Sequence, residues 1–195
     1  MSFFRNTQIA LFLFGLRAFA ASSGAGIANF YQVNENIYRG AQPGSAAFTY
    51  LANHGVKTVL DLREADERSR AEEKAVTASG MRYVNVPMTG LTPPTDAEIG
   101  RILTLLEDTS AGPVFIHCKR GADRTGAVIA AYRIQHDHWS NTQALNEAMS
   151  RGISFFQFPR QNYIRTFRPN QPETAQPSGK ILVESAVALA APATR

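Results

Sequence analysis

The chain has 195 residues, enough for one domain with a full hydrophobic core, and its 44% apolar and 18% charged residues are typical of a globular protein. The net charge of +4 favours anionic partners, but the Lys and Arg residues are scattered without a long basic block, which argues against nucleic acid as a partner. The single cysteine, Cys118, excludes an intramolecular disulfide and a Cys-x-x-Cys zinc site.

The N-terminal residues 1–25 predict a targeting segment. Arg5 gives a positive start, Ile9–Leu16 is an apolar stretch of the length found in signal peptides, and Ala18 opens an Ala-x-Ala cleavage site. We therefore expect an exported protein, periplasmic or secreted, with an amphipathic helix packed on the domain as the alternative. The apolar stretch is too short to cross a bilayer, so no stable membrane span is expected.

Strand and helix patterns alternate in the middle of the chain. In chain order the sequence predicts a hairpin at 31–39, a helix at 45–54, a strand at 56–62, a charged helix at 64–78, a strand at 81–88, a helix at 95–108, a buried strand at 113–117, a buried helix from about 124 to 134, and a helix from 140 towards Gly152. This alternation predicts an α/β fold with a central, largely parallel sheet flanked by helices. Such sheets place their ligands at the carboxyl ends of strands, and Cys118 falls at such an end.

Three groups of side chains have plain structural interpretations. The charged residues of the 64–78 helix predict a solvated face, and His136 and His138 predict a solvated helix end rather than a metal site. A set of aromatic residues is expected to close the core, namely Phe155, Phe156, Phe158, Tyr163 and Phe167. We assign the domain to residues 28–167 and a Pro- and Ala-rich tail to residues 168–195.

The segment around the cysteine combines a strand end, a tight loop and a helix start. Gly121 and Gly126 let the backbone curl and approach a ligand closely. Loop N–H groups that lead into a helix N-terminus form an anion site, and Arg124, six positions after Cys118, can offer two donors to a phosphate. This positive environment favours the thiolate, so the pair provides a nucleophile and an electrostatic clamp for covalent phosphoryl transfer.

Residues 117–126 (HCKRGADRTG) resemble the H-C-x-x-G-x-x-R-[ST]-G signature of cysteine-dependent protein tyrosine and dual-specificity phosphatases. Residues 37–43 (IYRGAQP) and 55–63 (GVKTVLDLR) resemble the bacterial, plant and fungal dual-specificity-like branch of that superfamily. The resemblance implies a dual-specificity phosphatase-like fold.

The resemblance also implies a role for each matching residue. Cys118 would attack phosphorus, Arg124 would bind phosphate, Thr125 would steady the departing thiolate, and His117 would tune the cysteine from behind. The implied phosphate-binding residues are Lys119, Arg120, Gly121, Ala122, Asp123 and Arg124.

The identity of the general acid is left open, because the loop at 87–95 (PMTGLTPPT) contains no acidic residue. Asp96 is the nearest candidate, and its alternative role is to complement the dipole of the following helix. Asp123 is the rival, and its alternative role is to brace the loop. We prefer Asp96, because the donor must reach the leaving oxygen opposite the nucleophile. Glu98 is interpreted as a helix cap with Thr95.

The sequence therefore predicts a monomeric phosphomonoester hydrolase of the protein tyrosine or dual-specificity type that uses no metal and no cofactor. Its partner would be a phosphorylated protein or a small phosphorylated substrate. Lys119 and Arg120 leave an inositol phosphate or phosphoinositide open, and the acid-free loop leaves a non-catalytic phosphate-binding module open. A nucleotide hydrolase of the G-x-x-x-x-G-K-[ST] type is excluded, and the loop spacing and single cysteine argue against sulfur transfer or arsenate reduction.

Overall fold

The computed structural model describes residues 25–169, so the expected targeting segment and the C-terminal tail lie almost entirely outside the described residues. The centre is a five-stranded sheet with the order β1-β2-β5-β3-β4. Its strands are β1 (Tyr31–Asn34), β2 (Ile37–Ala41), β3 (Thr58–Asp61), β4 (Arg82–Asn85) and β5 (Val114–Cys118). Only the β1–β2 pair is antiparallel within this sheet, which confirms the predicted α/β fold with a largely parallel sheet.

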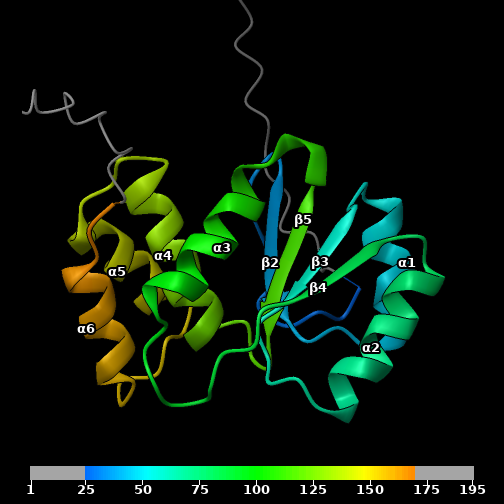
Figure 1. The fold of residues 1–195 in the computed structure, drawn as a ribbon, viewed down its shortest axis with the longest axis horizontal. Coiled ribbons are helices and arrows are strands. Elements are labelled where there is room, and N and C mark those ends of the chain that lie inside the picture. Colours follow the sequence, from blue (N-terminus) through cyan, green and yellow to red (C-terminus); the bar gives the residue numbers. More distant parts are fainter. Residues whose placement is uncertain (1–24, 170–195) are drawn as a thin grey trace, which may run out of the picture.

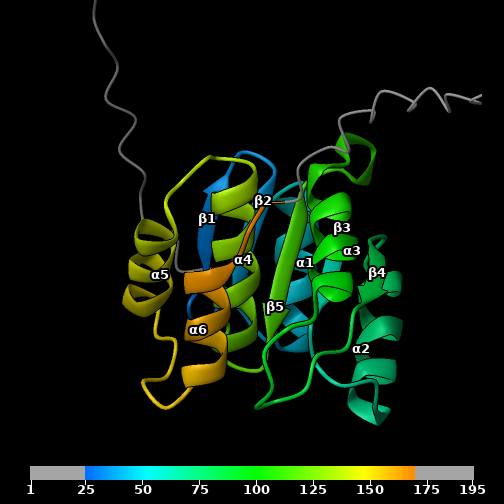
Figure 2. The same cartoon turned by 60° about the vertical axis from the view of Figure 1, so that its left-hand side comes forward.

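Helices cover both faces of the sheet, as Figures 1 and 2 show. They are α1 (Ser45–Asn53), α2 (Glu67–Ala78), α3 (Asp96–Glu107), the 3-10 turn η1 (Thr109–Ala111), α4 (Asp123–Gln135), α5 (Asn141–Ser150) and α6 (Phe158–Thr166). The helices α1 and α2 pack on one face, and α3 to α6 pack on the other.

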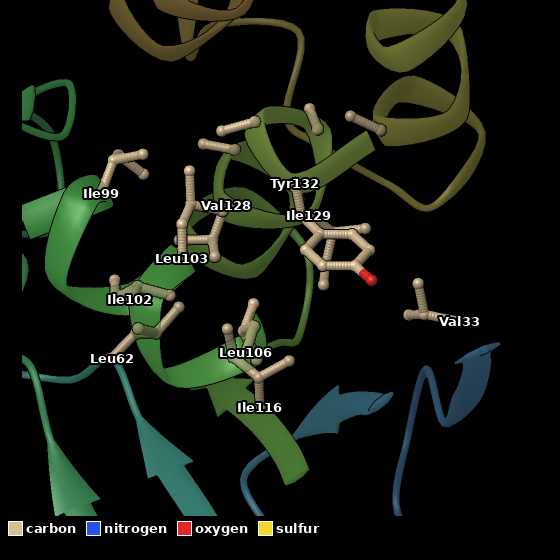
Figure 3. Close-up of a cluster of buried hydrophobic side chains, with 14 of the residues drawn as sticks. Val33, Leu62, Ile99, Ile102, Leu103, Leu106, Ile116, Val128, Ile129 and Tyr132 are labelled. Carbon is tan, nitrogen blue, oxygen red and sulfur yellow. The ribbon is translucent and has the colours of Figure 1, made fainter. Parts of the chain in front are cut away.

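The larger core lies between the sheet and the helices α3 and α4 (Figure 3). Side chains of α3 contribute one row, and the apolar helix α4 contributes the opposite row. The labelled members are Ile99, Ile102, Leu103 and Leu106 from α3, Val128, Ile129 and Tyr132 from α4, and Ile116, Leu62 and Val33 from the sheet region. Because α4 is buried on nearly every side, its N-terminus is held firmly against the end of β5.

Local signals explain where the helices begin. Capping boxes form at the start of α3, between Thr95 and Glu98, and at the start of α5, between Ser140 and Gln143. In each box the side chain of one residue accepts a hydrogen bond from the backbone N–H of the other. The charged helix starts later than expected, at Glu67, because the Asp66 side chain accepts from the backbone N–H groups of the first turn and so caps it there.

One expectation about burial was wrong. Phe155, Phe156 and Phe158 do not close the core, since they are 75%, 55% and 65% exposed. Instead, the neighbouring polar residues Gln157 and Arg160 are the buried ones. The charged helix α2 has the expected solvated face, but it turns Glu72 inward, where this side chain is almost fully buried.

The pair of histidines behaves as expected of a helix end. His136 is half-exposed, bonds to Asp137 through Nδ1 at 2.8 Å, and stacks on Tyr132. Asp137 also pairs with Arg133 at 2.6 Å. Among residues 25–169, no helix combines the length and the apolar character that a bilayer crossing needs.

Candidate active site

The phosphate loop, residues 118–124, connects the buried end of β5 to the start of α4. Cys118 is 2% exposed and ends the strand. The Gly121 carbonyl accepts bonds from Arg39 Nη2 at 2.7 Å and from Asn29 Nδ2 at 2.9 Å. Because side chains outside the loop bind this carbonyl, the loop is held in one conformation that leaves N–H groups for an anion.

Arg39 performs this bracing from inside the protein. It is 1% exposed on β2, and burial lowers the pKa of its guanidinium to about 10, which still leaves it protonated at neutral pH. Arg39 thus braces the phosphate loop through its bond to the Gly121 carbonyl.

Gly121 is required by the backbone itself. Its φ is +68°, in the region that favours glycine. A Cβ at this position would lie 2.3 to 2.5 Å from backbone atoms of Gly40 and Ala41. The loop can therefore approach β2 only with glycine at position 121.

Arg124 lies in the first turn of α4 and reaches across the ends of two other segments. Its Nη1 donates to the carbonyl of Leu62 at 3.3 Å and to that of Met88 at 3.1 Å. These bonds fix the guanidinium beside a cavity of about 220 Å³. The residues that line the cavity are Gln42, Arg63, Glu64, Arg68, Lys119 and Arg124. Four of these six carry a positive charge, so the cavity suits a multiply charged anion.

Thr125 follows Arg124 and is fully buried. Its Oγ1 has no hydrogen-bond partner within the part of the chain that the structure describes. A buried hydroxyl without a partner is uncommon. Its O–H can still donate to a charged group that develops nearby during a reaction.

A buried ionic cluster lies behind the cysteine. His117 is fully buried, and the register of the sheet places Asp61 of β3 directly beside it. His117 Nδ1 lies 3.3 Å from the Cys118 carbonyl, and Nε2 lies 2.7 Å from Glu72 Oε1, in contact but off the line of a good hydrogen bond. The imidazole thus links the backbone of Cys118 to an acidic group on α2.

Arg63 compensates the two carboxylates of this cluster. Its Nη2 lies 2.7 Å from both Asp61 Oδ2 and Glu72 Oε2. Burial alone would raise the pKa of Asp61, but the bonds from Arg63 outweigh it and hold that pKa below its ordinary value. The ligating atoms of Asp61, Glu72 and His117 lie within 4.8 Å of one another. With Arg63 bound to both acids, the trio fits an ion-pair cluster better than a cation site.

The sequence did not single out Glu72. Its position in a helix of many charged residues gave no signal, because its partners are Arg63, just after β3, and His117 of β5, which are distant in sequence.

The two candidate acids have different surroundings. Asp123 accepts a bond from the Ser154 N–H at 2.8 Å and pairs with Arg120 at 2.6 Å. Burial alone would raise the pKa of Asp123. The bonds from Ser154 and Arg120 outweigh this effect, so the pKa lies below its ordinary value. Asp96 is exposed at the start of α3 and accepts a bond from the Tyr163 hydroxyl at 3.1 Å. Neither aspartate lines the cavity in this structure.

The loop before α3 is fastened to α6. Arg160, fully buried, donates to the carbonyls of Thr89 and Gly90 at 2.5 and 2.8 Å, and Gln157 donates to Gly90 at 3.2 Å. Burial lowers the pKa of Arg160, and nearby Arg124 lowers it further. Sequence reasoning missed this connection, since nothing in the local pattern pairs residue 160 with residue 90.

These features can be compared with known proteins. A family model described as "DSP-PTPase phosphatase fused to NAD+ Kinase" matches residues 21–166. The chain belongs to this family. The match covers the described domain and includes the phosphate loop, which agrees with the resemblance seen in the sequence.

The curated relatives that match the chain are also named phosphatases. The dual specificity protein phosphatase TpbA of Pseudomonas aeruginosa (strain UCBPP-PA14) is 35% identical over 125 residues, which are 64% of this chain and 54% of that protein. The inositol diphosphatase DSP2 of Oryza sativa subsp. japonica is 28% identical over 130 residues, covering 61% of this chain and 59% of that protein. The chain therefore spans little more than half the length of these curated relatives.

Solved structures share the fold. The crystal structure of P. aeruginosa TpbA superimposes with a TM-score of 0.63 at 28% identity, covering 73% of this chain and 86% of that chain. The catalytic core of the PP-IP phosphatase SIW14 from S. cerevisiae gives a TM-score of 0.64 at 24% identity, covering 73% of this chain and 87% of that chain. The dual-specificity phosphatase-like fold implied by the sequence is confirmed.

Proposed function

We propose that this protein is a cysteine-dependent phosphatase that hydrolyses phosphomonoesters through a phosphocysteine intermediate. The observation that carries the proposal is the phosphate loop, which brings a buried cysteine and a fixed arginine to one cationic cavity. Membership of a phosphatase family supports it.

The reaction has two balanced steps. In the first, the Cys118 sulfur bonds to phosphorus while the bond from phosphorus to the leaving oxygen breaks, and Asp96 gives that oxygen its proton. Arg124 and the loop N–H groups compensate the charge on the transferring oxygens. In the second step, Asp96 takes a proton from water, whose oxygen bonds to phosphorus as the sulfur departs. The Thr125 hydroxyl donates to the departing thiolate.

Asp96 is proposed as the acid because Asp123 is already engaged by two donors that favour its ionised form. Asp123 then acts as the brace between the phosphate loop and the segment at Ser154. Since Asp96 does not line the cavity, the 87–95 loop must move towards the phosphate to deliver the proton.

The proposed substrate is a phosphorylated protein. The TpbA relatives are named dual specificity protein phosphatases, and one TpbA structure, at 28% identity, holds phosphotyrosine. A small polyphosphate such as an inositol phosphate is the second candidate. It is favoured by the four cationic side chains around the cavity, by the lack of any aromatic ring among the lining residues, and by the rice relative named an inositol diphosphatase.

We also propose that the protein is exported from a bacterial cell and acts as a monomer. The support for export is Arg5, the apolar stretch Ile9–Leu16 and the site at Ala18. Cell fractionation and N-terminal sequencing test it. A full-length chain in the cytoplasm would contradict export, and a dimer in sedimentation would contradict the monomer.

The activity is tested by hydrolysis of an aryl phosphate in the presence of a chelator. The wild-type chain should turn over, and Cys118→Ser should bind phosphate without turnover. A wild-type chain that binds phosphate but does not hydrolyse the ester would identify a non-catalytic binding module. Comparing a phosphotyrosine peptide with an inositol polyphosphate then distinguishes the two substrate classes by kcat/KM.

A further inference from the structure

Four large apolar side chains protrude into solvent and form what we call the apolar rim: Leu91, Phe155, Phe156 and Phe158. They are 71%, 75%, 55% and 65% exposed. Single exposed apolar residues are ordinary, but a group of them marks an interaction site. Met149 is the one other exposed large apolar side chain within residues 25–169, so exposure of this kind is concentrated in the rim.

The rim borders the phosphate loop. Leu91 follows Gly90, whose carbonyl is bound by Gln157 and Arg160, so it lies beside the segment that carries the three phenylalanines. That segment is tied in turn to the phosphate loop by the bond from Ser154 N–H to Asp123. Figures 1 and 2 show the loop before α3 and the loop before α6 at the same end of the molecule in both views.

The rings are held outward by the backbone beneath them. Gln161 Nε2 donates to the carbonyls of Ser154 and Phe155 at 3.0 and 3.1 Å. The rings of Phe155 and Phe156 pack edge to face, with centroids 5.5 Å apart. The same stretch buries its polar residues and exposes its aromatic ones, which reverses the usual order.

Cationic side chains lie beside this rim. Arg120, on the phosphate loop, is about half exposed and bonds to Ser154 next to Phe155. Lys119 and Arg68 line the adjoining cavity, and Arg68 is largely exposed. Asp123 and Asp66 pair with Arg120 and Arg68. Arg124 adds further positive charge at the cavity, whereas Arg63 is compensated by Asp61 and Glu72, and the lining also includes the acidic Glu64.

We propose that the apolar rim docks this protein on a bilayer surface that contains anionic phospholipid, with the cavity facing the phosphate headgroups. Protruding apolar side chains enter the boundary between headgroups and acyl chains, while neighbouring cations attract the anionic surface. A peptide partner usually requires a concave pocket for its own apolar anchors, whereas these rings project outward. The docking goes beyond the proposed hydrolysis and requires no turnover.

The test is co-sedimentation with vesicles, using the full chain carrying Cys118→Ser so that no headgroup is altered. Vesicles of phosphatidylcholine mixed with phosphatidylglycerol should bind the protein, and added salt should weaken binding. Phe155→Ser together with Phe158→Ser should weaken it roughly tenfold or more, because two exposed rings no longer leave water.

The matched control replaces the same two residues with leucine, which keeps the apolar surface and should retain binding. Both pairs should unfold at the parent temperature, because neither ring is in the core. Serine variants that bind vesicles as tightly as the parent would overturn the proposal.

A local reporter separates the rim from the N-terminal segment, which is the same in every variant. Phe156→Trp should add fluorescence that shifts to the blue and is quenched by brominated lipid, relative to the parent with Trp139 alone. No quenching of the added signal would contradict the proposal. The double serine variant gives a second way to contradict the proposal. If it bound vesicles normally but lost binding of a phosphotyrosine peptide, or lost self-association, the rim would be a protein-docking surface.

Discussion

At the scale of single residues, the two candidate acids differ in their neighbours. Asp123 accepts a backbone N–H and an arginine, and both favour its carboxylate form. Asp96 accepts from the neutral hydroxyl of Tyr163 at an exposed position. Asp123 is thus already engaged as a brace between two segments, which leaves Asp96 as the proposed acid.

Asp96→Asn should therefore lower kcat for an aryl phosphate by about a hundredfold, within the range typical of general acid catalysis. The loss should be larger for phenyl phosphate than for p-nitrophenyl phosphate, because the poorer leaving group depends more on the proton. Steady-state kinetics with both esters measure it. Asp123→Asn is the control and should not change the ratio between the esters; the opposite ranking would make Asp123 the acid.

The two glycines of the signature are expected to respond differently to alanine. Gly121→Ala should lower the free energy of unfolding by about 3 kcal/mol or more and abolish turnover, because its Cβ would collide with backbone at 2.3 to 2.5 Å. At Gly126 a Cβ would meet its nearest neighbours at ordinary distances of 3.6 to 3.7 Å. Gly126→Ala should keep the fold, as urea denaturation would show. Equal destabilisation by both changes would contradict this account of the loop.

At the scale of elements, the fastening of the 87–95 loop to α6 links the proposed acid to the rest of the site. Arg160 holds the backbone of Thr89 and Gly90, while Arg124 holds the carbonyl of Met88. One arginine of α6 and one of α4 thus fix the position where the loop begins. In the proposed reaction, this position sets the path by which Asp96 would approach the phosphate.

Arg160→Met should reduce kcat by about tenfold with little change in KM, because the loop would deliver the proton less often. Hydrogen exchange at Met88, whose N–H donates to the Leu62 carbonyl at 3.2 Å at the start of this loop, should accelerate in the same variant. Arg165→Met, on the exposed side of the same helix, is the matched control and should leave both unchanged. A normal kcat in Arg160→Met would show that this fastening has no part in catalysis.

At the scale of the whole molecule, buried charge makes stability depend on pH. Asp61 and Asp123 both have a pKa below the ordinary aspartate value in the folded chain, through Arg63 in one case and through Ser154 and Arg120 in the other. A carboxyl of this kind binds a proton more readily when unfolded, so its stabilising contribution is complete above the unfolded pKa and is lost as the pH falls through the folded one.

The free energy of unfolding should therefore decrease as the pH falls below the ordinary aspartate range. Asp123→Asn should make that decrease less steep, since one of the titrating groups is gone. Urea denaturation at a series of acidic pH values measures the slope. An unchanged slope in Asp123→Asn would contradict the lowered pKa of this residue.

The sequence was sufficient for the architecture and for the phosphate loop. The alternation of strand and helix patterns along the chain predicted the parallel sheet, and turn and capping residues predicted most helix ends. Both signals are local, because they depend on residues close together in the sequence. Glu72 and Arg160 could not be predicted, since each is buried by partners distant in sequence. Phe155 was wrongly placed in the core because aromatic residues are usually buried, whereas here Gln157 and Arg160 take the inner positions.

Detection of a phosphoryl group on Cys118 would test the proposed phosphocysteine mechanism without relying on rates. Acid-quenched Asp96→Asn, mixed with an excess of p-nitrophenyl phosphate, should carry one phosphoryl group on Cys118 by peptide mass spectrometry, because breakdown of the intermediate also needs Asp96. The wild-type chain should show a smaller amount that disappears once substrate is exhausted, and Cys118→Ser should show none. Two results would rule out a phosphocysteine intermediate: turnover that continues in Cys118→Ser, or wild-type turnover with no phosphoryl group on Cys118 in the wild type or in Asp96→Asn.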